Sequence, residues 1–171
     1  MQDLSPSDTL LAIAEIAVAF AGFASLSTIF GRQLSGQSLE VAAGRLAILL
    51  FLSLSTLALA FTPLILMSFD FANELIWKYG AIFAIPLAIG AMPFYVKRVS
   101  RMRKLPDFNH SVSLLMLLMV VVFFSSMLIG AFGVVSSFGV YLMGLVSLLF
   151  MGGLMFTLVV LTVLAHPASG D

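Results

Sequence analysis

A single carboxylate, Glu15, stands in an otherwise uncharged run that extends from Thr9 to Phe30. A carboxyl group in such a run could bind a cation, carry a proton or donate a hydrogen bond as the neutral acid. Hydrocarbon disfavours a bare carboxylate, so the group needs a proton, water, a cation or a polar partner. Glu15 is therefore the residue from which a functional hypothesis starts.

Hydroxyl groups recur at a similar depth in the other apolar segments. At 1.5 Å of rise per residue, Glu15 lies about 9 Å inside the edge of its apolar run. Counting inward from the same membrane face, roughly 10 to 12 Å brings the chain to Thr62, Ser125, Ser126 and Ser147. These side chains, with Glu15, are the predicted lining of an ion or proton path. The alternative is structural, with a protonated Glu15 joining two helices by a hydrogen bond of about 1 kcal/mol.

The surroundings of Glu15 on its own helix are small. On a helical wheel it lies away from the bulky Ile16, Phe20 and Phe23. Small residues allow helices to approach closely in lipid, and those beside Glu15 are Ala12, Ala19, Gly22 and Ser25. A second small stripe contains Ala14, Ala17, Ala21, Ala24 and Thr28. We therefore expect Glu15 to face protein rather than lipid.

Pro63 creates a second polar requirement inside an apolar segment. A proline within a helix removes one backbone hydrogen bond and should kink or split the helix. The carbonyl of Leu59, four residues earlier, loses its donor and needs another within the membrane. Glu15 in its neutral form could donate to this carbonyl or to a serine.

The elements that must position these groups follow from composition. Of the 171 residues, 61% are hydrophobic and only 9% are charged, against about 25% charged in ordinary soluble domains. Apolar runs long enough to cross a bilayer as helices lie at about 9–30, 46–69, 75–96, 111–133 and 139–165. The chain is thus predicted to be all-α, a polytopic helical membrane protein forming a single transmembrane domain over residues 1–171. The competing topology has four spans, with one segment re-entrant or merged.

Basic residues set the expected orientation. A cluster follows the third apolar segment and consists of Lys97, Arg98, Arg101, Arg103 and Lys104. With five spans, Arg32 and Arg45 fall on the same side, and Lys78 is the only basic residue on the other. The positive-inside rule then places the N-terminus outside and the C-terminus inside, in a cytoplasmic (inner) membrane. The cluster is read as a topology determinant, with binding of an anionic lipid or effector as the alternative.

Aromatic residues at the ends of the third segment give a related expectation. Trp77 and Tyr79 lie at one end, and Phe94 and Tyr95 lie at the other. Trp and Tyr gather at membrane interfaces because their rings are amphipathic. We expect these residues to form interfacial belts.

The sequence lacks the residues on which several classes of function depend. The chain has no cysteine, and its two histidines, His110 and His166, lie at span ends without an acidic pair, which disfavours a metal or haem site. No phosphate-binding, nucleophile-elbow or zinc-protease motif occurs. We therefore expect no enzyme activity, no catalytic residue, no metal and no cofactor. Balanced charge, eight basic against eight acidic residues, indicates no nucleic-acid partner.

Three functions remain for a chain that consists of spans. The first is a homo-oligomeric channel-like or ion-conducting protein with Glu15 near the path. The second is an accessory or scaffold subunit of a larger membrane complex, bound through small-residue faces. A more distant third is lipid binding at the proline-rich third segment. The faces that can pack helices within or between chains include Gly80, Ala84, Ala88, Ser126, Gly130, Gly152 and Gly153.

Overall fold

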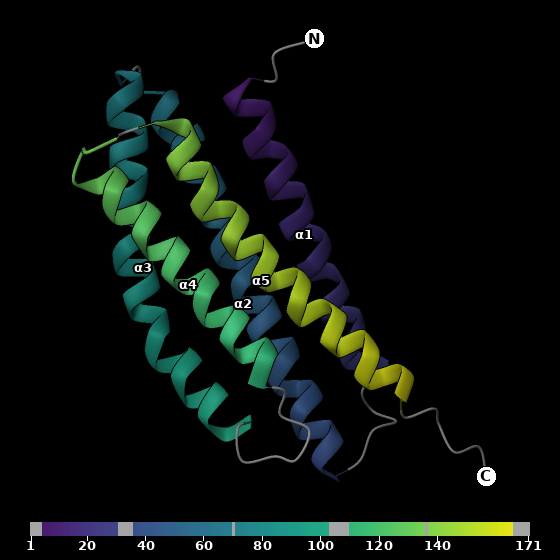
Figure 1. Ribbon diagram of the computed structural model, residues 1–171. Coiled ribbons are helices and arrows are strands. Elements are labelled where there is room, and N and C mark those ends of the chain that lie inside the picture. Colours follow the sequence, from purple (N-terminus) through teal and green to yellow (C-terminus); the bar gives the residue numbers. More distant parts are fainter. Residues whose placement is uncertain (1–4, 31–35, 70, 103–109, 136, 166–171) are drawn as a thin grey trace.

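The computed structural model describes residues 5–30, 36–69, 71–102, 110–135 and 137–165. The described chain forms five helices that run alternately up and down (Figure 1): α1 (Pro6–Phe30), α2 (Gly36–Met67), α3 (Asn73–Met102), α4 (His110–Ala131) and α5 (Phe138–Ala165). Each contains a stretch that is long and apolar enough to cross a membrane. The predicted all-α architecture, with five helices long and apolar enough to span a membrane, is confirmed.

The apolar stretches cover 6–26, 42–67, 73–97, 111–131 and 138–161. For the second and third segments they agree with the predicted bounds more closely than the helices do. There α2 begins at Gly36, well before the predicted start at 46, and α3 continues to Met102. Hydropathy marks where a helix crosses the bilayer, whereas the backbone hydrogen bonds of the helix continue into its polar extension.

Local sequence explains how the helices start and stop. The Asp8 N–H donates to Oγ of Ser5 at 3.1 Å, so Ser5 caps α1. Between α4 and α5, Gly133 adopts a φ of 73°, the left-handed conformation that commonly ends a helix. The Val140 N–H then donates to Oγ of Ser137 at 3.5 Å. A short connection thus joins α4, which ends at Ala131, to α5, which begins at Phe138.

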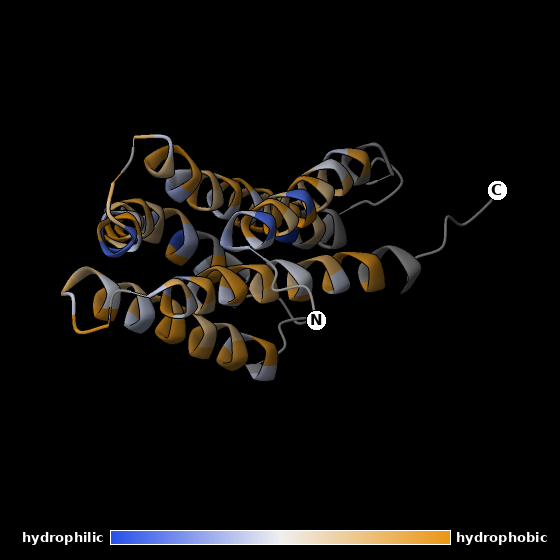
Figure 2. Cartoon of the chain, turned by 90° about the horizontal axis from the view of Figure 1, so that it is seen from above, coloured by the Kyte–Doolittle hydropathy of each residue, from blue (hydrophilic) through white to orange (hydrophobic). Residues whose placement is uncertain are grey.

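Two helices form the centre of the bundle. α2 and α5 pack extensively on each other, α1 packs on both from one side, and α3 and α4 pack from the other (Figure 1). Hydrophobic residues cover outward as well as inward surfaces of the helices (Figure 2). A bundle that is apolar on both sides suits a multi-pass membrane protein.

The Leu59 carbonyl does find a donor, and that donor is Tyr141. α2 continues through Pro63 rather than splitting there. The hydroxyl of Tyr141, on α5, donates to the Leu59 carbonyl oxygen at 2.6 Å. Tyr141 is only 2% exposed, so this bond is shielded from any solvent. The expectation that Glu15 could donate to this carbonyl is wrong, because the Tyr141 hydroxyl reaches it from the adjoining helix.

Aromatic packing holds the Tyr141 ring in place. Its centroid lies 6.0 Å from that of Trp77, which in turn lies 5.1 Å from Phe138. Trp77 is buried, whereas Tyr79 is exposed. The predicted interfacial belt is therefore wrong for Trp77, whose ring belongs to the contact between α3 and α5.

Most of the small-residue faces are used inside the chain. A Cβ added to Gly130 would lie 3.1 Å from the Ala81 Cβ, and one added to Gly152 would lie 3.3 Å from the Phe20 ring. Gly80, Ala84 and Ser126 are also buried. Close packing between α3, α4 and α5 and between α1 and α5 thus accounts for these residues without a second chain.

We predict that Tyr141→Phe lowers stability by about 1 kcal/mol, since it leaves the Leu59 carbonyl without a donor in an apolar interior. In a Pro63→Ala background the cost should shrink, because the alanine restores a backbone N–H that can donate to Leu59. Unfolding by denaturing detergent in mixed micelles measures the double-mutant cycle. Tyr79→Phe, at an exposed tyrosine, is the control. An equal cost in both backgrounds would show that the hydroxyl does not serve this carbonyl.

We also predict that Gly80→Ala is less stable than Gly90→Ala by about 1 kcal/mol or more. A Cβ at Gly80 would lie 3.1 Å from Cε2 of Tyr141, and the ring is held by its hydrogen bond and by Trp77. Nothing lies within 4 Å of the corresponding atom at Gly90, so that variant gains helix propensity without a clash. The same unfolding assay compares the two variants. Equal stability would mean that the Tyr141 ring moves aside for the added methyl group.

Candidate functional site

Glu15 lies on the outward face of α1. Its side chain is exposed, and so are those of Ala12 and Ala19 beside it, with Gly22 one further turn along. The expectation that Glu15 faces protein is wrong within a single chain. α1 carries two small stripes, and the chain packs the other one, burying Ala14, Ala17 and Ala24.

Aromatic side chains fix this rotation of α1. Phe20 lies against Gly152 of α5, and the Phe20 and Phe23 rings lie 5.7 Å and 4.3 Å from that of Phe156. At the other end of the helix, the Ser7 hydroxyl approaches the Met67 sulfur at 3.8 Å. With Phe20 and Phe23 directed at α5, Glu15 is directed away from the bundle.

The carboxyl group of Glu15 has no polar partner in the part of the chain that the structure describes. No hydrogen bond or ion pair from a described residue reaches it. Its exposed neighbours include Leu11 and Val18, which are apolar. Nor do three His, Asp or Glu side chains gather anywhere among the described residues to hold a metal ion. A carboxyl group among apolar side chains within a span is accommodated by a proton, water, a cation or a polar group from outside the described chain.

The predicted hydroxyl layer separates into different contacts. Ser126 and Ser147 are buried and come together at Gly144: Ser147 donates to the Gly144 carbonyl at 2.7 Å, and a Cβ on Gly144 would lie 2.8 Å from Oγ of Ser126. Ser126 itself donates to the Phe123 carbonyl at 2.9 Å. Each of these hydrogen bonds stays within its own helix. The two serines therefore sit in the contact between α4 and α5.

The other two hydroxyl residues lie elsewhere. Thr62, half-buried on α2, donates to the Ala58 carbonyl at 2.8 Å, and Ser125 is exposed on α4. α1 packs on α2 and α5, whereas α4 packs on α3 and α5. Glu15 on the outward side of α1 is thus not brought together with Ser125 or Ser126. A path lined by all five residues within one chain is not formed, although the role of each stays a prediction.

Polar side chains at the opposite end of the bundle are described in part. Arg45 of α2 is half-buried and donates to the Leu158 carbonyl of α5 at 3.3 Å. Of the basic cluster, Lys97 is exposed on α3. The side chains of Arg98 and Arg101, and the residues Arg103 and Lys104, lie outside the described part of the structure, as do the side chain of His110 and the residue His166.

Tyr141 is the polar residue that the sequence reasoning missed. A signal existed, because a proline inside an apolar segment frees a carbonyl four residues earlier, and tyrosine is a long donor able to reach across helices. Tyr141 lies only four residues into α5, where it resembles an interfacial aromatic residue. Sequence position alone does not distinguish a buried hydrogen-bond donor from an aromatic residue at the membrane interface.

Comparisons do not add a relative to this picture: no protein-family model, no curated protein and no solved structure matches the chain. The arrangement of side chains is therefore the basis for assigning a function. In the described residues it offers an exposed carboxyl far from the ends of its span, that of Glu15, and a set of hydroxyls that are bonded to their own helices.

Proposed function

We propose that this chain is a channel-like membrane protein that works as a homo-oligomer, with the outward face of α1 at the contact between subunits. The observation that carries the proposal is the exposure of Glu15 within a span, among small residues and without a polar partner in the described chain. A charged side chain within a spanning helix carries a free-energy cost that reaches roughly 2.5 to 3.5 kcal/mol at the bilayer centre. Assembly removes that cost if Glu15 then faces water, a cation or a polar group of another subunit.

The spacing of the outward residues favours helix pairing. Ala12, Glu15, Ala19 and Gly22 recur at intervals of three and four residues, the pattern that places side chains on one seam of two packed helices. Small residues on that seam let the backbones approach closely. Two or more copies of α1 around a symmetry axis would bring their Glu15 side chains together into a ring, as in cation-conducting pores.

The proposal includes no catalytic chemistry, because an isolated carboxyl lacks the paired base that would activate a nucleophile. An accessory or scaffold role would use the same α1 face against a different membrane protein. Purification from native membranes separates the two roles. A symmetric assembly of this chain supports the channel, and stoichiometric recovery of a foreign polypeptide supports the accessory subunit.

We predict that Gly22→Leu shifts the oligomer towards monomer. Nothing lies within 4 Å of a Cβ built on Gly22, so leucine fits the single chain while it blocks close approach of a second α1. Gly90→Leu is the matched control, since Gly90 is equally open but lies on α3. Native mass spectrometry from lipid nanodiscs measures the subunit number. Unchanged assembly of Gly22→Leu would exclude this face as the contact.

We predict that Glu15→Gln changes the conductance or the cation selectivity of the protein in liposomes, because it removes the titratable charge from the ring. Glu74→Gln makes the same change at an exposed position in the first turn of α3 and should have little effect. Steady conductance that is insensitive to Glu15→Gln would remove Glu15 from the path. Absence of any conductance from the assembled protein would refute the channel and leave the accessory role.

The orientation with the N-terminus outside and the C-terminus inside a cytoplasmic membrane belongs to the same proposal. Because the chain has no cysteine, single-cysteine variants report sidedness cleanly. We predict that Ala72→Cys, before α3, reacts with a membrane-impermeant maleimide from outside intact cells, and that Ser100→Cys reacts only after permeabilisation. Both side chains are exposed. The reverse pattern would invert the topology.

A further inference from the structure

Two adjoining hollows lie along α3, on the side of the bundle away from α1. The inner one is lined by α2, α3, α4 and α5, and the outer one lies between α3 and α4. Met92, Tyr95 and Val120 line both. The two hollows therefore adjoin at these three side chains and follow one another along α3.

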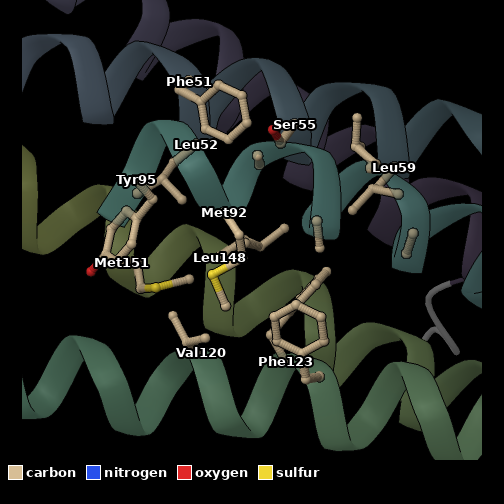
Figure 3. A pocket seen from close by; sticks show the side chains of 15 residues that line it. Phe51, Leu52, Ser55, Leu59, Met92, Tyr95, Val120, Phe123, Leu148 and Met151 are labelled. Atoms are coloured by element: carbon tan, nitrogen blue, oxygen red, sulfur yellow. The ribbon is translucent and has the colours of Figure 1, made fainter. Parts of the chain in front are cut away.

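The inner hollow is apolar and small. Its volume is about 70 Å³, roughly half that of the engineered 150 Å³ cavity that binds benzene in another protein. Figure 3 shows the side chains that converge on it, among them Phe51, Leu52, Phe123, Leu148 and Met151. A hollow of this size and lining accepts a few methylene groups and offers little to a polar ligand.

The outer hollow is larger, and it changes character along its length. Its volume is about 560 Å³, and its lining includes the apolar Val96, Leu114 and Leu117, which are exposed on the surface. At its mouth stand two hydroxyl residues, Ser100 of α3 and Ser113 of α4. The apolar stretch of α3 ends at Lys97 and that of α4 begins at Ser111, so both serines lie at the membrane boundary.

A cationic side chain stands beside this mouth. Lys97 is exposed and lies three residues before Ser100 on α3, a spacing that makes the two residues neighbours on a helix surface. One end of the hollow therefore carries a positive charge and two hydroxyls, and the other end is hydrocarbon. That sequence of chemistries matches a phospholipid, with its anionic headgroup at the boundary and its acyl chain in the interior.

We propose that the hollow between α3 and α4 is a binding site for one anionic phospholipid of the surrounding leaflet. The headgroup lies at Lys97, Ser100 and Ser113, and one acyl chain passes Met92 and Val120 so that its end enters the inner hollow. From Ser100 to Ala84, which lines the inner hollow, α3 rises about 24 Å. This exceeds the roughly 15 Å of one leaflet's hydrocarbon, so the site is long enough for a complete chain.

A peptide segment fits this space less well. The inner lining offers few polar side chains, namely Ser55 and Tyr95, and the Tyr95 hydroxyl already approaches the Met116 sulfur at 3.8 Å. Backbone N–H and C=O groups of an extended peptide would lack partners there. The site is independent of the proposed oligomer, because it involves neither α1 nor Glu15.

Photolabelling tests the site directly. The full chain is reconstituted in phosphatidylcholine vesicles that contain a small fraction of phosphatidylglycerol carrying a diazirine at the end of one acyl chain. After irradiation, labelled peptides are mapped by mass spectrometry. We expect label concentrated around Met92, Val120 and Phe123. Label spread evenly over exposed residues away from α1 and the hollows, such as Leu54 and Ile65 of α2 and Val146 of α5, would overturn the proposal.

Two pairs of variants separate the acyl chain from the headgroup. Ala91→Phe fills the inner hollow and should lower labelling there several-fold, whereas Ile89→Phe adds a ring to an exposed position nearby and should not. Lys97→Gln should lower the preference for phosphatidylglycerol over a phosphatidylcholine probe by about fivefold, and Lys78→Gln, near the opposite end of α3, should not. If Ala91→Phe fails to fold, the position of the label in the unaltered chain decides whether an acyl chain enters the inner hollow. Equal labelling by both lipids in the unaltered chain would refute the anionic headgroup.

Discussion

A backbone carbonyl without a helical donor cannot turn to water inside a bilayer, and the fold is organised around the answer to that constraint. Pro63 removes the N–H that would serve Leu59, and the Tyr141 hydroxyl replaces it at 2.6 Å. This hydrogen bond joins the two central helices, α2 and α5, at the level of Leu59 and Tyr141. The tyrosine ring then needs space, which the absence of a side chain at Gly80 provides on α3. The proline on α2 thus creates the need for a donor that the tyrosine on α5 meets, and the tyrosine ring needs the space that the glycine on α3 leaves.

The positions of small residues also explain which helix faces are packed within the chain and which are left exposed. Gly130 and Gly152 let neighbouring helices approach to contact distance, and without a hydrophobic force between helices in lipid, such packing is what holds spans together. On α1 one small stripe is consumed in this way, with Ala14 and Ala17 buried, but the stripe that carries Glu15 is left outward. The exposure of this carboxyl group within a span is the feature on which the proposed contact with a second subunit rests.

The sequence predicted the number and type of the helices well, because the hydrophobicity that marks a span adds up over about twenty residues. Long apolar runs identify spans, and the Ser5 cap and the turn after α4 follow from local chemistry. The rotation of each helix was predicted less well. α1 has two small stripes, and only the fit of Phe20 and Phe23 against α5 selects between them. Trp77 was misplaced for a related reason: an aromatic residue near a helix end is equally suited to an interface or a core, and the choice depends on Phe138 and Tyr141 arriving from another helix. Depth along a helix can be counted, whereas direction around it depends on partners that are distant in sequence.

The outward face of α1 and the hollow between α3 and α4 lie on different sides of the central pair, since α1 contacts only one side of α2 and α5 while α3 and α4 occupy the other. An assembly built through α1 would therefore leave the hollow facing the bilayer, open to exchange of lipid. A lipid seated at Met92 and Val120 would likewise leave the α1 seam free, because none of the residues that line the two hollows lies on α1. The central helix α5 connects the two faces on which function is proposed. Its Gly152 lies against Phe20 of α1, and the adjacent Met151 lines the inner hollow.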